Sequence, residues 1–264
     1  MLRAHDAMAR ALIGYTGFVG GNLRTQGSFT DVYNSANIGE IAGKSFELVV
    51  SAGCRAAKWI ANKEPQADRE DIAVLTRALE RVRAERFVLI STIDVYPRPI
   101  EVDESTPIAA AEGQPYGRHR FELEQFVRAR FPSALIVRLP GLFGAGLKKN
   151  AIFDLLHDNR LDLVHQGGVF QFYDLAQLNA DIERCLGAGV ELVNFATEPV
   201  SVLDVAREAF GREFQNTLPP PAPRYDFRTR HASVWNRRGH YLATRAEVLA
   251  SIRRFVEREK SRAP

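Results

Sequence analysis

Short apolar runs alternate with longer amphipathic stretches along most of the chain. The runs carry many β-branched and aromatic residues, and this composition is typical of buried strands. They cover residues 11–13, 29–34, 46–53, 86–92, 134–138 and 192–195. Between them, apolar positions recur at helical spacing, which predicts helices over about 18–24, 65–85, 116–130, 148–158 and 174–186.

Local sequence signals predict where several helices begin. Pro65 opens the stretch over 65–85, and proline is favoured in the first turn of a helix. Two capping boxes, which begin at Ser201 and Thr244, predict two further helices near the C-terminal end. Four prolines within residues 217–223 mark the clearest linker in the chain.

This order of strands and helices predicts an α/β fold with a Rossmann-type, doubly wound parallel sheet. A length of 264 residues suits one such domain. We expect residues 1–264 to form a single Rossmann-type domain, with a small second lobe made by about 142–173 and 212–264.

Three glycines follow the first apolar run at intervals of three, namely Gly14, Gly17 and Gly20. Glycine permits a tight turn and a close approach of the backbone, and the following helix start can bind a pyrophosphate through its free N–H groups. A plain strand-to-helix turn explains the same glycines without a ligand. The remaining strand ends therefore decide between the two interpretations.

Small and hydroxylated residues stand at the ends of several other predicted strands, at 51–53, 91–92 and 140–141. In an open parallel sheet, ligands bind at the carboxyl ends of the strands. We expect these residues and the glycine loop to converge on one rim of the sheet.

Tyr116 and Arg120 lie four residues apart on a predicted helix and so share one face. A free tyrosine has a pKa near ~10, and a cation within about 4–6 Å lowers it. A hydroxyl such as that of Thr92, bonded to the same substrate oxygen, would complete a proton-transfer site. Two alternatives stay open: Thr92 only caps a strand end, and Arg120 is a surface charge paired with Glu124.

Five ordered motifs resemble the extended short-chain dehydrogenases/reductases. Within them, the NAD-dependent epimerase/dehydratase group and the dTDP-4-dehydrorhamnose reductases are the most similar. The resemblance covers roughly residues 10–210. Its motifs are the glycine loop 14–20, Ser-Thr-Ile-Asp-Val-Tyr at 91–96, Pro-Tyr-Gly at 115–117, Arg-Leu-Pro-Gly at 138–141 and Phe-Gly at 143–144.

The resemblance implies NAD or NADP as cofactor and assigns roles to individual residues. Tyr116 matches the catalytic tyrosine of the family, Thr92 the strand-end hydroxyl, and Arg120 stands where the family has a lysine. The cofactor would contact Gly14, Thr16, Gly17, Phe18, Val19, Gly20, Asn34, Ala52, Gly53, Ser91 and Pro140. Lys148 and Asn150 would contact the substrate, although Asn150 could equally cap a helix.

Two departures from the family pattern bear on function. Arginine at position 120 keeps the positive charge of lysine, but its longer planar fork is aimed differently. Asn34 stands where an acidic residue would mark NAD, and Arg24 could reach a 2′-phosphate. The choice between NAD and NADP is open on these residues.

The composition argues against several classes of protein but does not identify one by itself. The net charge of +3 is too small to argue for nucleic acid, although basic residues gather near the C-terminal end. The two cysteines, Cys54 and Cys185, and the scattered histidines show no metal-ligand spacing. Because we find neither a signal peptide nor a membrane span, we expect a cytoplasmic protein.

These observations lead to two hypotheses. The first is an NAD(P)-dependent oxidoreductase or epimerase that acts on a hydroxyl or keto carbon, with a nucleotide sugar as the candidate small-molecule substrate. The second is a catalytically altered or inactive relative that binds NAD(P) as a sensor or scaffold. Family relatives form homodimers through helices that flank the sheet, which makes the Tyr116 helix a candidate dimer surface.

Overall fold

The computed structural model describes residues 9–262, which form two compact units. Unit 1 comprises residues 9–97, 107–138 and 179–192. Unit 2 comprises residues 98–106, 139–178 and 193–262. Within the described range, no helix is long and apolar enough to cross a membrane.

Unit 1 is built on a six-stranded sheet whose strand order is β2-β1-β3-β4-β5-β9. The pairs β1–β2, β1–β3 and β3–β4 are parallel. The bounds are β1 Arg10–Ile13, β2 Asp31–Tyr33, β3 Ser45–Ser51, β4 Arg83–Thr92, β5 Ala134–Leu139 and β9 Leu192–Asn194. The structure confirms the predicted Rossmann-type fold.

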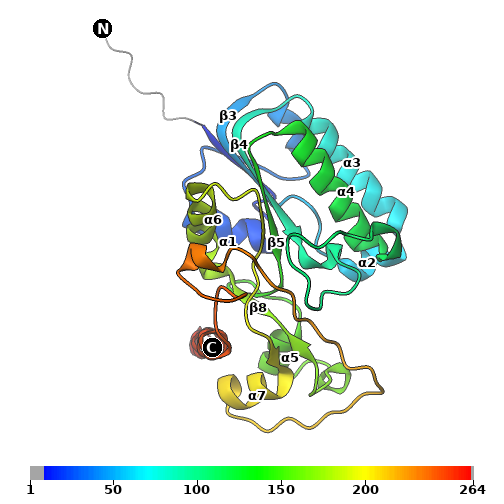
Figure 1. Ribbon diagram of the computed structural model, residues 1–264, viewed down its shortest axis with the longest axis vertical. Helices are drawn as coiled ribbons and strands as arrows, with labels where there is room; N and C mark the ends of the chain where they lie inside the picture. The colour runs from blue at the N-terminus through cyan, green and yellow to red at the C-terminus, as the bar shows by residue number, and fades with distance from the viewer. Residues whose placement is uncertain (1–8, 263–264) are drawn as a thin grey trace. The chain divides into compact units, whose positions relative to one another are not determined.

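Helices cover both faces of this sheet (Figure 1). α1 (Phe18–Gln26) and α6 (Leu178–Gly187) lie on one face, and α3 (Pro65–Leu79) and α4 (Pro115–Arg130) lie on the other. The short helix α2 (Lys58–Lys63) packs against both α3 and α4. Val49, Phe87 and Ile136 of β3, β4 and β5 form an apolar core together with Leu123 and Val127 of α4.

Unit 2 contains α5 (Ala151–His157), α7 (Val202–Phe210) and α8 (Arg245–Arg262). Two strand pairs accompany them: β6 (Gly141–Phe143) with β8 (Phe172–Asp174), and β7 (Val169–Phe170) with β10 (Val200–Ser201). Its own apolar core includes Phe143, Ile152, Val205, Ile252 and Phe255. Both predicted capping boxes are present: Ser201 with Asp204 at the start of α7, and Thr244 with Glu247 at the start of α8.

Several predicted boundaries were wrong. The helix over 65–85 ends at Leu79, and β4 begins at Arg83 rather than at residue 86. Ser45 of β3 pairs with Arg83, so backbone pairing with β3 extends β4 over its polar first residues. The hydrophobic pattern of the sequence does not reveal this pairing. α5 begins three residues later than predicted and α6 four residues later. The short elements α2, β6, β7, β8 and β10 were not predicted.

Candidate active site

The carboxyl ends of β1, β3 and β4 lie at one edge of the sheet in unit 1. Ile13 pairs with Ser51, and Ser51 pairs with Leu89 in turn. The loops that follow are in close contact, because a Cβ on Gly14 would lie 2.3 Å from the carbonyl oxygen of Ala52. The expected convergence of the glycine loop with residues 51–53 and 91–92 is therefore present within this unit.

The glycine loop fits a bound pyrophosphate. Gly14 has a φ of +85°, and a Cβ on Gly20 would lie 2.1 Å from the carbonyl oxygen of Gly14, so both positions require glycine. Gly17 is exposed at the N-cap of α1, and the first turn of that helix carries no acidic residue. The first N–H groups of a helix lack intrahelical partners and favour an anion. Phe18 and Val19 lie in that first turn, and Thr16 directly precedes the N-cap.

Asn34 lies at the end of β2 beside two residues from the first βα unit. Its amide nitrogen donates to the Tyr15 hydroxyl at 3.4 Å, and its amide oxygen accepts from the backbone N–H of Ala36. The Arg24 guanidinium lies over the Tyr15 ring, 4.8 Å from its centroid. Tyr15 thus contacts both the exposed Arg24 and the neutral Asn34, which stands where an acidic residue would otherwise contact a ribose.

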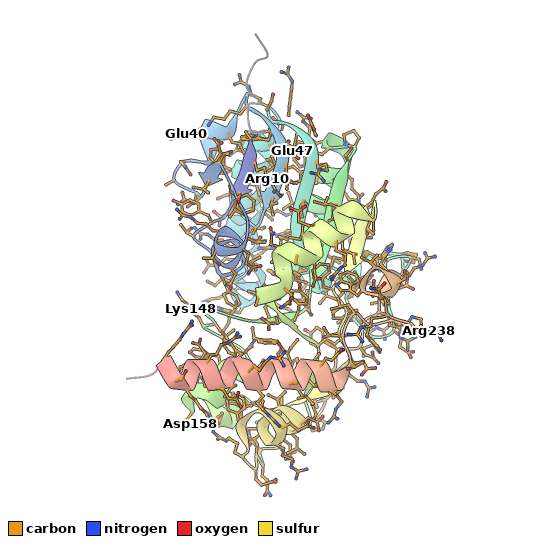
Figure 2. The ribbon with its side chains drawn as sticks, turned by 90° about the vertical axis from the view of Figure 1, so that its left-hand side faces the viewer. Arg10, Glu40, Glu47, Lys148, Asp158 and Arg238 are labelled. Carbon is orange, nitrogen blue, oxygen red and sulfur yellow. The ribbon has the colours of Figure 1, made fainter. Side chains whose placement is uncertain are left out.

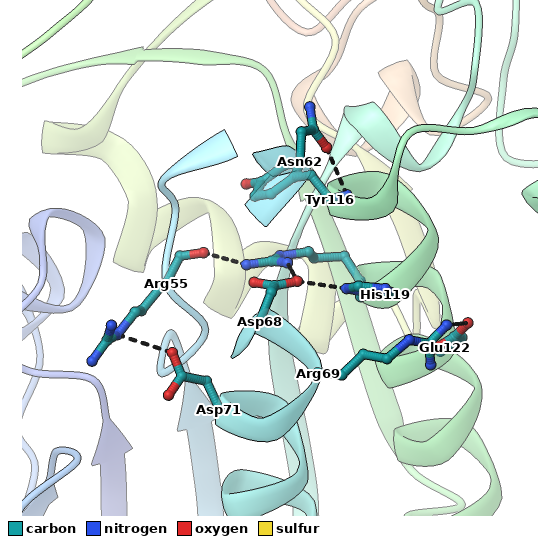
Figure 3. A network of polar contacts seen from close by, with 9 residues as sticks. Arg55, Asn62, Asp68, Arg69, Asp71, Tyr116, His119 and Glu122 are labelled. Carbon is teal, nitrogen blue, oxygen red and sulfur yellow. Dashed lines mark hydrogen bonds and ion pairs between the residues drawn. The ribbon is translucent and has the colours of Figure 1, made fainter. Parts of the chain in front are cut away.

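Its own proline and two neighbours fix the first turn of α4, which carries Tyr116. Pro115 occupies the first helical position, and the backbone N–H of Tyr116 donates to the side-chain oxygen of Asn62 from α2 at 2.9 Å (Figure 3). The turn also lies directly against the segment after β4, because a Cβ on Gly117 would lie 1.9 Å from the carbonyl oxygen of Asp94. Glycine at position 117 therefore allows the close approach of α4 to that segment.

Tyr116 and Thr92 are brought together: the Thr92 side chain is among the groups that act on the Tyr116 phenol. Tyr116 is buried, and burial raises its pKa to about 12. The nearby Arg120 charge and the Thr92 hydroxyl act in the opposite direction, whereas Asp94 and Cys54 raise the pKa further. The cation thus has the predicted effect on the phenol, but burial outweighs it.

Arg120 is buried with 3% of its surface exposed, and it does not pair with Glu124. Its guanidinium lies over the Tyr116 ring, 4.1 Å from the centroid, and donates to the Asp68 carboxylate and to the carbonyl oxygen of Arg55. The alternative of a surface ion pair with Glu124 is therefore wrong. The helix turns Glu124 toward the sheet, where it binds another arginine.

That arginine is Arg138 of β5, and the pair forms a buried cluster with Ser91 and Tyr96. Arg138 donates to both carboxylate oxygens of Glu124, at 3.0 and 2.6 Å from its Nε and Nη2 atoms, and to the Tyr96 hydroxyl at 2.7 Å. The Ser91 hydroxyl donates to Glu124 at 2.5 Å. The Ser91 hydroxyl is thus hydrogen-bonded to Glu124, whereas the side chain of its neighbour Thr92 lies beside Tyr116.

The remaining predicted contact residues belong to unit 2. Asn150 caps α5: its side-chain oxygen accepts from the backbone N–H groups of Ile152 and Phe153, and its nitrogen donates to the carbonyl oxygen of Leu142. Lys148 is exposed (Figure 2). Pro140 precedes β6, with its side chain partly buried. Their roles toward a substrate or cofactor stay predictions.

Sequence reasoning missed three polar residues around Tyr116, namely Asn62, Asp68 and Asp94. Asp68 could have been noticed, because it precedes Ile72 and Leu75 by four and seven residues and so lies on the apolar stripe of α3. Asp94 accepts from Lys58 at 2.8 Å. Asn62 lies in a helix that the pattern did not predict, so no signal pointed to it.

The chain belongs to the NAD dependent epimerase/dehydratase family, whose profile matches residues 26–161. It is thus an NAD(P)-dependent enzyme of the extended short-chain dehydrogenase/reductase group, with NAD or NADP as its cofactor. The matched segment contains Thr92, Tyr116 and Arg120 and begins after the glycine loop. No curated protein sequence matches the chain significantly.

Solved structures share the fold at low sequence identity. An NAD-dependent NDP-hexosamine 5,6-dehydratase involved in tunicamycin biosynthesis is 19% identical, with a TM-score of 0.73 over 97% of this chain and 99% of that one. A dTDP-4-dehydrorhamnose reductase from Bacillus anthracis, solved with NADP, is 18% identical, with a TM-score of 0.72 over 97% and 100%. A UDP-galactose 4-epimerase is 15% identical, with a TM-score of 0.68 over 96% and 99%.

Proposed function

We propose that this enzyme oxidises, reduces or epimerises a hydroxyl or keto carbon of a nucleotide sugar, with Tyr116 as the acid/base. The observation that carries the proposal is the position of Thr92 beside Tyr116, which places two hydroxyl groups together at the end of β4. Several solved structures with this fold are enzymes of nucleotide sugars, which supports the substrate class.

Each residue of this pair has a distinct task. The Thr92 hydroxyl binds the reacting oxygen of the substrate and orients it toward the phenol. Tyr116 donates a proton to that oxygen during reduction and accepts one during oxidation. The bound nicotinamide supplies or accepts the hydride. Lys148 and Asn150 are our candidates for contacts with the substrate, Lys148 through its exposed ammonium group and Asn150 at the start of α5.

At neutral pH, the protonation state of Tyr116 favours proton donation over proton acceptance. With a pKa raised to about 12 by burial, the phenol keeps its proton and is ready to donate it. Proton acceptance requires the phenolate, which is scarce at pH 7 unless a bound ligand changes the surroundings of the phenol. We therefore propose that Tyr116 acts as the proton donor when a keto group is reduced.

We further propose that NADP is the preferred cofactor. The neutral Asn34 does not repel a 2′-phosphate, and the Arg24 guanidinium, held on the Tyr15 ring, supplies a positive charge beside it. A phosphate binds an arginine fork through charge-assisted hydrogen bonds.

The proposal is tested with a panel of nucleoside-diphosphate keto and hydroxy sugars in the presence of NADH, NADPH or their oxidised forms. Nicotinamide absorbance reports net oxidation or reduction, and chromatography of the sugar reports epimerisation without net redox change. We expect turnover of at least one keto sugar with NADPH. Saturable cofactor binding without turnover of any sugar would favour a sensor or scaffold, and no binding of either dinucleotide would contradict the proposal.

A further inference from the structure

Arg120 occupies a fixed position between three elements. It projects from α4, its Nη1 donates to Asp68 of α3, and its Nη2 donates to the carbonyl oxygen of Arg55 in the loop after β3. The two acceptors, reached by different nitrogens, fix the plane of the guanidinium. In that plane it lies over the Tyr116 ring, 4.1 Å from the centroid.

The burial of this arginine makes its partner essential. A buried cation is strongly unfavourable unless a carboxylate and further hydrogen bonds accompany it. Only 4% of the Arg120 side chain and 7% of the Asp68 side chain are exposed. Without the carboxylate, the guanidinium gains free energy by moving toward water, and the long arginine side chain has many rotamers that permit this movement.

Asp68 is itself held in place. It lies in the first turn of α3, where the helix dipole stabilises a negative charge. The same oxygen that binds Arg120 is 2.7 Å from Nδ1 of His119, which is 1% exposed. The carboxylate is therefore anchored by its own helix and by the neighbouring residue of α4.

We propose that Asp68 is a positioning residue, which holds the Arg120 guanidinium against the Tyr116 ring and so fixes the cation that faces the acid/base. This inference rests on the proposed role of Tyr116. Asp68 does not touch the phenol oxygen in this arrangement; it acts through Arg120. A cation so close to a phenol favours the phenolate and thereby eases proton release.

Other charged and titratable groups surround the pair, and the test must separate their influence from that of Asp68. They come from the loop after β3, from α2, from α3, from the segment after β4 and from α4: Cys54, Arg55, Lys58, Asp71, Asp94 and His119. A test that changes Asp68 alone leaves all of them in place.

The test uses the sign of a shift in the pKa of residue 116. Tyr116 is replaced by 3,5-difluorotyrosine, whose ring fluorines lower the phenol pKa into an accessible range, and the label is titrated by ¹⁹F NMR in the full-length protein without substrate. If Asp68 positions Arg120, Asp68→Ala releases the cation and raises the pKa of the label by about 1 unit. If Asp68 is only a counter-charge, its removal leaves Arg120 in place and lowers the pKa.

Arg120→Met provides the matched background. It removes the cation, so we expect the pKa of the label to rise, and Asp68→Ala added to it should cause no further rise. Should Asp68→Ala fail to fold, Asp68→Asn keeps the shape of the side chain, and a smaller rise is expected because a neutral amide binds the guanidinium weakly. If the pKa of the label falls or does not change in the folded Asp68 variants, the inference is overturned. Since no turnover is measured, that result is distinct from a failure of the proposed function.

Discussion

At the scale of single residues, the site combines two hydroxyl groups with one buried cation. The Thr92 hydroxyl lies beside the Tyr116 phenol, and Arg120 covers the face of the phenol ring. Burial keeps the phenol protonated, while the hydroxyl and the cation oppose that effect. The balance of these influences, rather than any one residue, sets the pKa of Tyr116 and thereby how easily it exchanges a proton.

Thr92 gives the first prediction at this scale. Thr92→Val removes the hydroxyl with little change in shape, so the reacting oxygen loses one of its two partners, and we expect kcat to fall by about 10²-fold. Thr92→Ser keeps the hydroxyl and should retain most of the activity. The measurement is steady-state turnover at saturating cofactor. Full activity of Thr92→Val would contradict the role given to the hydroxyl.

Arg24 gives the second prediction, which concerns cofactor choice. Arg24→Gln removes the charge beside Asn34, and we expect the Kd for NADPH to rise about tenfold while the Kd for NADH changes little, because only NADPH carries the 2′-phosphate. Arg77→Gln on the exposed side of α3 is the matched control. Calorimetric titration with both cofactors measures the difference. Equal effects on the two cofactors would contradict a contact with the 2′-phosphate.

At the scale of elements, the position of Tyr116 depends on how closely α4 packs against its neighbours. Asn62 of α2 binds the first turn of α4, and Gly117 lets that turn touch the backbone of Asp94. The buried pair of Glu124 and Arg138 fixes the middle of the helix to β5. Contacts in the first turn and in the middle of α4 therefore hold Tyr116 in place.

The close approach at Gly117 gives the third prediction. A Cβ there would lie 1.9 Å from a backbone oxygen, so Gly117→Ala must displace the start of α4. We expect a loss of about 2 kcal/mol in the free energy of unfolding and a clear fall in kcat. Gly187→Ala in α6 is the control, because a Cβ there meets nothing within 4 Å. Urea unfolding and turnover measure both effects; a variant as stable and active as the control would contradict the packing described.

The sequence allowed most of unit 1 to be predicted, because its strands and helices follow simple hydrophobic periods. The meeting of Tyr116 with Thr92 was also predicted, from their places on a helix and at a strand end. The surroundings of Arg120 were not, because the partner Asp68 lies 52 residues earlier and only packing of α3 on α4 brings the two together. Short strands of unit 2 carry too few residues for a period to be recognised.

At the scale of the whole molecule, burial around the site makes stability depend on pH. The pKa of the Cys54 thiol is raised from 9.0 to about 11, first by burial and then by Asp68 and Asp71, against the influence of Arg120. The folded state therefore keeps the thiol proton at a pH where the unfolded chain has lost it. Such a group contributes stability that is present below pH 9 and is lost as the pH rises through 11.

Cys54→Ala tests this dependence as the fourth prediction. Between pH 8 and 10.5, the free energy of unfolding of the wild type should fall by about 1–2 kcal/mol more than that of the variant, since only the wild type carries the shifted thiol. Denaturant unfolding of both proteins at several pH values gives the difference. Parallel curves for the two proteins would show that the thiol has an ordinary pKa in the folded state.

The central claim is that Tyr116 transfers the proton, and Tyr116→Phe tests it most directly. The variant keeps the ring beneath Arg120 and loses only the hydroxyl, so fold and cofactor binding should be preserved. With a keto sugar that the wild type reduces, we predict that kcat falls by about 10³-fold while the Kd for NADPH changes by less than about threefold. A Tyr116→Phe enzyme that retains full turnover would contradict the account.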